Sequence, residues 1–314
     1  MQPFLLPLRR WAKTVSATAF SVRRHAPQAF RSSTATTSAF RTTARTSSPM
    51  TLHFRLQRDG SLVTSAPMYA DTFLEFTWDT EANRIIPTCP PAELPKEPES
   101  VYRALRYGTA KFLQQCGIKR MTVGLSGGID SAVTAVMYAD ILGPENVLLL
   151  NLPSRFNSAA TRNSAQQLAQ ALGANYAVMP ISESYELTVK QLEETPITHL
   201  ADGSSFNLQL SGLIKENIQA RDRGARVIAA ASAAFGGAFS CNSNKTELAI
   251  GYATFYGDIC GAMAMIGDLW KHQVYALGRY LNEVIYKREV IPRSHLQYPP
   301  QRRAFGCADS RQRR

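Results

Sequence analysis

The most regular hydrophobic pattern in the chain runs from residue 121 to residue 181, where short apolar runs alternate with longer amphipathic segments. Three apolar runs predict buried strands at 121–125 (MTVGL), 146–152 (NVLLLNL) and 175–181 (NYAVMPI). The segments between them, 130–142 and 158–173, carry apolar residues at helical spacing, and Gly173 is a typical helix stop. This strand–helix alternation with continuously apolar strands predicts a parallel sheet with helices on both faces.

Four further segments predict the helices that complete a doubly wound α/β domain: about 99–116, 182–194, 211–234 and 271–287. Before them, residues 51–85 alternate in short runs around the turn dipeptide Asp59-Gly60, which predicts β-strands. Residues 87–98 hold five prolines, which is typical of an extended linker. We therefore expect one α/β domain over 97–300, preceded by a smaller segment over 51–96.

The two ends of the chain differ in composition from this middle part. Residues 1–50 are rich in Arg, Ser and Thr and contain no acidic residue. This composition is typical of a mitochondrial transit segment, and a disordered basic tail or a start at Met50 explains it as well; none of these interpretations gives the segment a fold. We expect a mitochondrial location if the segment is a genuine transit signal and a cytoplasmic one otherwise. Residues 301–314 are also Arg-rich, and the composition changes abruptly where they begin.

The formal net charge of +11 is concentrated at these two ends. Residues 1–50 carry +8 and residues 301–314 carry +4, which leaves −1 for residues 51–300. A protein that binds nucleic acid would carry its basic surface on the folded part, so we expect no nucleic-acid partner. No apolar segment approaches the roughly 20 residues of a membrane span, so we expect no membrane partner. The five cysteines show no metal-site spacing, which favours reduced thiols inside the cell.

A glycine-rich loop stands between the first predicted strand and the helix that follows it. It consists of Gly124, Leu125, Ser126, Gly127, Gly128, Ile129, Asp130 and Ser131. Ligands of doubly wound sheets bind at the carboxyl ends of strands, where glycines and a helix N-terminus let backbone N–H groups approach a phosphate. The loop lacks the lysine of G-x-x-x-x-G-K-[ST] and carries Asp130 instead. Asp130 would repel phosphate unless a cation lay between them, which predicts Mg²⁺; a helix cap without a ligand is the alternative.

The motif S-G-G-x-D-S after a strand resembles the pyrophosphate loop of the N-type ATP pyrophosphatases, which cleave ATP to AMP and pyrophosphate while they adenylate a substrate. Four later motifs narrow the resemblance: E-N-x-Q-A-R at 216–221, N-K-[ST]-E-x-x-x-G-Y at 244–252, Y-G-D at 256–258 and [KR]-x-x-V-Y at 271–275. With these motifs, about 97–300 is similar to the ammonia-ligase domain of NAD synthetases, especially the glutamine-dependent bacterial kind. The resemblance implies an adenine nucleotide alpha hydrolase-like fold. It also implies ATP-dependent amidation of deamido-NAD to NAD through an acyl-adenylate.

Glu247 has a predicted role that its position alone supports, because it opens a helix after a polar loop and can give Mg²⁺ a second carboxylate beside Asp130. The resemblance implies further roles. It assigns ATP to the residues of the glycine-rich loop and to Asn242, Lys271, Pro153, Ser154 and Arg155. It assigns deamido-NAD to Asn217, Arg221, Glu247 and Asp258, and catalysis to Asp130, Lys271 and Asp258. A capping glutamate, a solvated lysine, a surface ion pair and a plain loop acid are the structural alternatives for these side chains.

The chain also departs from its relatives. Glutamine-dependent relatives carry a nitrilase-like domain that delivers ammonia, and residues 51–96 look like only the tail of that domain with its linker. We therefore expect free ammonia, or a separate glutaminase, as the nitrogen source, and a homodimer as in relatives. Residues 301–314 lack the closing stretch of relatives, which makes a catalytically impaired nucleotide-binding fragment the alternative function. Another ATP pyrophosphatase, such as a GMP synthetase or a tRNA-modifying enzyme, is the third interpretation.

Overall fold

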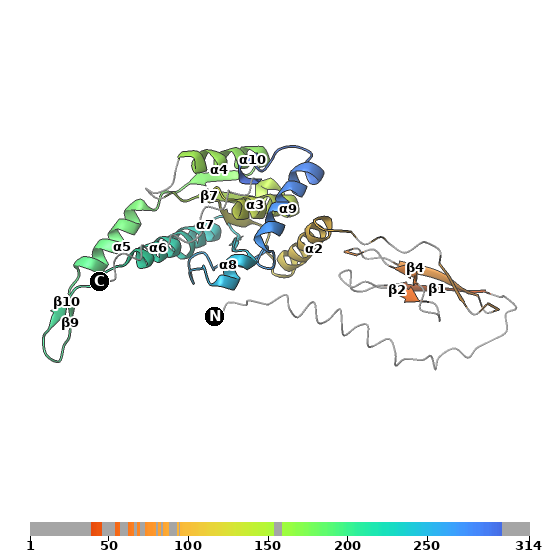
Figure 1. Cartoon of the computed structure of the whole chain (residues 1–314), viewed down its shortest axis with the longest axis horizontal. Coiled ribbons are helices and arrows are strands. Elements are labelled where there is room, and N and C mark those ends of the chain that lie inside the picture. The colour runs from red at the N-terminus through yellow and green to blue at the C-terminus, as the bar shows by residue number, and fades with distance from the viewer. Residues whose placement is uncertain are drawn as a thin grey trace, which may run out of the picture. The chain divides into compact units, whose positions relative to one another are not determined.

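The computed structural model describes residues 95–153 and 159–296, together with residue 93 and the short stretches 39–45, 54–56, 62–65, 68–69, 73–79, 81–82 and 84–87. The chain divides into two compact units between Tyr107 and Gly108. Helix α2 (Glu99–Gln115) spans this division (Figure 1). Of the predicted N-terminal segment 1–50, residues 1–38 and 46–50 lie outside the described residues, as does the whole predicted segment 301–314.

The first unit holds two small antiparallel sheets. Strands β1 (Ala39–Arg45), β4 (Phe73–Asp79) and β5 (Arg84–Pro87) form one, and β2 (Phe54–Leu56) and β3 (Leu62–Ser65) form the other. Phe76 in β4 lies opposite Thr42 on one side and Pro87 on the other. The strands expected within 51–85 are present, but the expectation of no fold before residue 50 is wrong for β1. Its sequence AFRTTAR has no clear alternation, and pairing with β4 over its whole length places it in the sheet.

The second unit is built on a parallel sheet with the strand order β11-β6-β7-β8. The strands are β6 (Met121–Gly124), β7 (Val147–Asn151), β8 (Asn175–Val178) and β11 (Ala238–Phe239). Met121 lies opposite Val147 in β7 and Ala238 in β11. The three predicted strands are confirmed, each one to three residues shorter than the apolar run. The fourth strand was missed because two residues are too few to show a hydrophobic pattern.

Helices cover both faces of this sheet, as expected for a doubly wound fold (Figure 1). One layer is formed by α3 (Ile129–Leu142), α4 (Ala159–Leu172) and α9 (Lys271–Tyr280), which continues into the π-helix η3 (Leu281–Ile285). The other contains the π-helix η2 (Asp222–Ile228) and α7 (Ala229–Ala234). Leu150 packs with Ile228 and Leu148 lies in the same cluster, so Leu149 between them faces α3 and α4.

Helix α3 is buried more completely than its sequence pattern predicted. An apolar stripe on one side was expected, yet every residue from Ile129 to Ala139 except Asp130 is buried. The cause is that α3 contacts the sheet, α4 and α9 at once. A Cβ added at Gly278 in α9 would lie 3.2 Å from the Ile129 Cδ1 atom, which shows how closely the two helices pack. The glycine-rich loop is therefore attached to a helix that is buried over most of its length.

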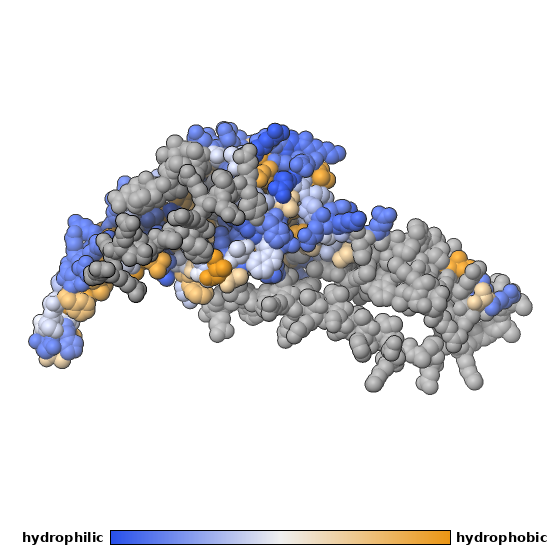
Figure 2. All heavy atoms as spheres, in the orientation of Figure 1, coloured by the Kyte–Doolittle hydropathy of each residue, from blue (hydrophilic) through white to orange (hydrophobic). Residues whose placement is uncertain are grey.

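The remaining elements are short or lie away from this core: η1 (Pro144–Asn146), α5 (Ser182–Glu194), β9 (Ile197–Thr198), β10 (Ser205–Phe206), α6 (Gly212–Arg221), α8 (Lys245–Ile250) and α10 (Arg293–Leu296). Strands β9 and β10 form a hairpin at the end of α5 (Figure 1). Hydrophobic side chains are exposed among polar ones there, and Leu200 is 94% exposed (Figure 2). None of the helices in the described part of the chain has the length and apolar character that a membrane crossing requires.

Candidate active site

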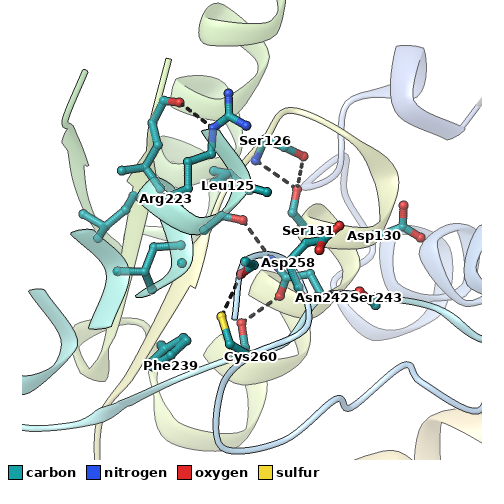
Figure 3. A pocket seen from close by; sticks show the side chains of 18 of the residues that line it. Leu125, Ser126, Asp130, Ser131, Arg223, Phe239, Asn242, Ser243, Asp258 and Cys260 are labelled. Atoms are coloured by element: carbon teal, nitrogen blue, oxygen red, sulfur yellow. Dashed lines mark hydrogen bonds between the residues drawn. The ribbon is translucent and has the colours of Figure 1, made fainter. Parts of the chain in front are cut away.

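A cavity of about 370 Å³ opens at the carboxyl ends of β6 and β7, which is where the glycine-rich loop begins (Figure 3). Its size is within the roughly 300–1,000 Å³ typical of small-molecule sites. Residues from four parts of the chain line it: the loop after β6, the end of β7, the stretch from the end of α6 through η2, and the segment from Phe239 of β11 to Cys260. Of the predicted site residues, it brings together Gly124, Leu125, Ser126, Asp130, Ser131, Asn242, Glu247 and Asp258.

Hydrogen bonds within the glycine-rich loop stabilise its conformation. It turns at Gly127, whose φ of 83° lies in the left-handed region that glycine adopts without steric cost. The Ser126 N–H donates to Ser131 Oγ (3.3 Å), and the Gly128 N–H donates to Ser126 Oγ (3.2 Å). Among the residues that the structure describes, no side chain caps the N-terminus of α3 at Gly128, which leaves its first-turn N–H groups available to an anion.

Two asparagine amides fix the start of this loop from opposite sides. Asn151, at the end of β7, donates through Nδ2 to the Leu125 carbonyl (2.9 Å). Asn242 donates through Nδ2 to the Gly124 carbonyl (2.9 Å) and accepts from Ser240 Oγ (2.7 Å). Sequence reasoning missed Asn151, although a polar residue near the end of the apolar run NVLLLNL was a visible signal. Consecutive carbonyls of the loop are thus held by side chains as well as by the sheet.

Asp130 and Glu247 meet through a single residue, Asn244, that is fully buried. The Asn244 Nδ2 atom donates to Asp130 Oδ1 (3.0 Å), and its backbone N–H donates to Glu247 Oε2 (3.2 Å). Its Oδ1 atom accepts from the N–H groups of Thr246 (2.9 Å) and Glu247 (3.2 Å), which caps α8. Lys271 Nζ, from the start of α9, forms an ion pair with Asp130 Oδ2. The sequence motif contained Asn244, but no role was predicted for it.

The acidic groups of the cavity raise the question of whether they suit Mg²⁺. Burial raises the pKa of the Glu247 carboxyl, and the charges of Asp130 and Asp258 raise it further, against the lowering by the Asn244 N–H and by Lys271. Among the described residues no cluster of three His, Cys, Asp or Glu side chains could hold a metal by itself. Mg²⁺ is typically held by one or two carboxylates together with substrate phosphates. Asp130 and Glu247 fit that arrangement, because a shared cation would relieve the repulsion between them.

The other predicted residues lie around the cavity or outside it. On α6, Asn217 Oδ1 accepts from Thr254 Oγ1 (2.7 Å), and Arg221 Nε donates to the Phe255 carbonyl (3.3 Å). Asp258 is exposed, and its Oδ1 atom accepts from the Thr254 N–H. The side chains of Ile129 and Pro153 are buried, and the Ile129 side chain packs beside α9. Ser154 and Arg155 lie outside the described residues.

Two glycines allow η2 to approach the turn at 257–260. A Cβ added at Gly224 would lie 2.0 Å from the Gly257 carbonyl oxygen and 2.7 Å from Cys260 Sγ. A Cβ added at Gly257 would lie 2.9 Å from the Ala220 Cβ atom. Both glycines and Cys260 line the cavity, so this contact sets the distance between two of its walls.

We predict that Gly224→Ala lowers the free energy of unfolding by about 1–3 kcal/mol, the usual cost of added volume in a packed interior. The turn at 257–260 has to move to admit the new Cβ atom. Thermal unfolding of the purified variant measures the loss. Gly212→Ala in α6 is the matched control, because a Cβ added there meets nothing within 4 Å. Equal melting temperatures for the two variants would contradict the prediction.

Comparison with known proteins gives one family. The family model described as NAD synthase matches residues 101–306. The glutamine-dependent NAD(+) synthetase of Synechocystis sp. is 33% identical over 248 residues, which are 79% of this chain and 42% of that protein. The chain therefore spans less than half the length of this curated relative.

Solved structures agree with this match. A glutamine-dependent NAD+ synthetase from Acinetobacter baumannii, in complex with ADP, superposes with a TM-score of 0.66 at 26% identity, over 80% of this chain and 44% of that one. An NH3-dependent NAD synthetase from Campylobacter jejuni, in complex with the nitrate ion, superposes with a TM-score of 0.52 at 28% identity, over 62% of this chain and 78% of that one. The matched residues include the parallel sheet, the glycine-rich loop after β6 and the ordered motifs up to Lys271. The chain belongs to the NAD synthase family.

Proposed function

We propose that this chain is a carbon–nitrogen ligase that amidates deamido-NAD to NAD at the expense of ATP, releasing AMP and pyrophosphate. One observation carries the proposal: Asp130 of the glycine-rich loop is bonded to Lys271 and to Asn244, which also holds Glu247, beside a nucleotide-sized cavity. A triphosphate at the loop would meet N–H groups, a lysine and two carboxylates within reach of one cation. Family membership supports the choice of substrate.

In the first half-reaction, a carboxylate oxygen of deamido-NAD forms a bond to the α-phosphorus of ATP. The bond from that phosphorus to the bridging oxygen breaks, and its electron pair leaves with pyrophosphate. The first-turn N–H groups of α3 and the hydroxyls of Ser126 and Ser131 would hold the departing oxygens. Asp130 and Glu247 would hold Mg²⁺, which when bound would supply positive charge that stabilises the leaving group. Asn244 keeps the two carboxylates in place.

In the second half-reaction, ammonia attacks the acyl carbon, AMP leaves, and the amide loses a proton. We propose free ammonia as the donor because the cavity cysteine is unsuited to glutamine hydrolysis. Burial raises the pKa of the Cys260 thiol to about 11, with further raising by Cys241 and Asp258, and its Sγ atom donates to the Gly257 carbonyl (2.7 Å). A glutaminase needs a reactive thiolate, which requires a lowered pKa. Cys241 is buried and bonded to the Asp258 carbonyl.

We predict that the purified chain forms NAD from deamido-NAD, ATP and Mg²⁺ when ammonium is supplied and forms none with glutamine. Chromatographic measurement of NAD, with AMP and pyrophosphate measured in parallel, gives the result. Synthesis of NAD from glutamine would contradict the choice of donor. ATP binding with no NAD from either donor would favour the impaired-fragment alternative. Turnover of xanthosine monophosphate in place of deamido-NAD would point to a different ATP pyrophosphatase.

A further inference from the structure

The cavity holds an unusual arrangement of charge. Its lining includes the carboxylates of Asp130, Glu247 and Asp258, and among the described residues that line it Arg223 is the one cationic side chain. Lys271 is directed to Asp130 instead. In Figure 3, Arg223 and Asp130 are drawn on opposite sides of Ser126.

Arg223 is held firmly but without an ion-pair partner within 4.0 Å among the residues that the structure describes. Its Nε atom donates to the Leu152 carbonyl (3.3 Å), and Nη2 donates to Gln219 Oε1 (3.3 Å). Its neighbour Asp222 is engaged elsewhere, by Arg226 and by Ser184 Oγ (2.7 Å). Burial lowers the pKa of the Arg223 guanidinium, against the raising effect of the Asp222 charge. The two neutral acceptors orient the group, and the charge of Asp222 acts on it without a direct ion pair.

A half-buried guanidinium without an anion is energetically costly, and such groups gather at ligand sites. Guanidinium has five N–H donors in a planar fork that matches the oxygens of a phosphate. Nε and one hydrogen of Nη2 bind protein acceptors, so the remaining donors of the fork are available to the cavity. The π-helical segment η2 gives Arg223 this position, and a widened helical turn of this kind is frequent at functional sites.

We propose that Arg223 binds the α-phosphoryl group of the nucleotide, the phosphate that stays with adenosine when pyrophosphate leaves. This assignment rests on the proposed function. Under the proposed function, Asp130 and Glu247 would hold the cation and the loop would bind the pyrophosphate that leaves, so the α-phosphate needs a separate cationic partner. The guanidinium would neutralise the nonbridging α-oxygens while the carboxylate attacks, and it gives up no proton in the step. The pyrophosphate of deamido-NAD has the same chemistry and is the competing source of the phosphate.

Equilibrium binding to the full chain tests the proposal with three probes: AMP, adenosine and deamido-NAD. We expect Arg223→Lys and Arg223→Met to weaken AMP binding about tenfold to hundredfold, which corresponds to the loss of one charge-assisted hydrogen bond. Adenosine has no phosphate, so its affinity should stay unchanged. Arg226→Lys is the matched control, because this neighbouring arginine is exposed and pairs with Asp222 outside the cavity. It should bind all three probes as the unmodified chain does.

Each contrary result has a distinct meaning. Unchanged AMP binding in both Arg223 variants would overturn the proposal, and so would weakened binding of deamido-NAD alone, which would assign the arginine to the dinucleotide. An equal loss of AMP and adenosine binding would overturn it as well, because that would show a structural role. If the unmodified chain makes no NAD but binds AMP in an Arg223-dependent way, the proposed function fails and the phosphate site stands. If the unmodified chain makes NAD and both Arg223 variants bind AMP with unchanged affinity, the proposed function stands and the proposed phosphate site fails.

Discussion

Asp130→Asn is expected to reduce pyrophosphate release from ATP and deamido-NAD by at least about 100-fold, a typical effect of removing one strong electrostatic group from a catalytic site. Asparagine has the shape of aspartate and can still accept a hydrogen bond from Asn244, so the fold should persist. It lacks the negative charge that pairs with Lys271 and that attracts a cation to the phosphates. A continuous pyrophosphate assay at saturating ATP, with titration of Mg²⁺, measures the effect.

Asp202→Asn provides the control for this variant. Asp202 is an exposed residue between β9 and β10 and bonds only locally, to the Ser204 N–H (2.8 Å) and to His199 Nδ1 (3.0 Å). Its turnover should match that of the unmodified chain. If Asp130→Asn retained full turnover as well, the carboxylate of the loop would have no part in the reaction, and the assignment of a cation to Asp130 and Glu247 would fall with it.

Asn244→Ala is expected to have the second large effect, on stability and activity together. It removes the cap of α8, which is worth about 0.5–2 kcal/mol, and it leaves a half-buried oxygen of Asp130 without its donor. We expect the free energy of unfolding to fall by about 2–4 kcal/mol and NAD synthesis to fall more than tenfold in the protein that remains folded. Chemical denaturation and initial rates below the unfolding transition measure the two effects separately.

Two further variants separate the cap from the site. Asn244→Ser keeps a good capping side chain but cannot reach Asp130 as the amide does, so it should recover stability without recovering activity. Asn282 is a matched residue that does not line the cavity, and its amide also makes three hydrogen bonds, to Val290 and Ile291. Asn282→Ala should lose stability and keep its specific activity. If Asn244→Ser were as active as the unmodified chain, the bond to Asp130 would not matter for the reaction.

The fold could be predicted from the sequence where a residue's neighbours in the chain decide its structure. Strands β6 and β7 are mostly buried and therefore appear as continuous apolar runs. Strand β8 is last in the strand order of the described sheet, and its end residues Asn175 and Val178 are exposed, although its sequence is part of an apolar run. Strand β11 consists of Ala238 and Phe239 alone, and only its pairing with β6 makes it a strand. The strand β1 and the hairpin of β9 and β10 are defined by pairing in the same way, so no local pattern could have predicted them.

The residues of the candidate site also differ in whether the local sequence indicates their role. The glycine-rich loop is a local feature, in which the acid predicted a cation, and the position of Glu247 at the start of a helix suggested it as the second carboxylate. Asn244 brings Glu247 to Asp130, which agrees with that expectation. Arg223 had no such signal, and the signal at Asn151, one polar residue near the end of an apolar run, did not indicate what its side chain contacts. Their importance depends on facing a cavity whose other walls come from distant parts of the chain.

The pairing of β6 with β11 has a consequence for synthesis on the ribosome. Met121 emerges more than a hundred residues before its partner Ala238, and Asn244, Glu247 and Lys271 emerge later still. A nascent chain can assemble β6, β7 and β8 by contacts of shorter range, but one edge of β6 stays open during that time. A nucleotide bound at the proposed site would therefore not support the early stages of folding, and it would stabilise the domain only after the residues up to Lys271 have been translated.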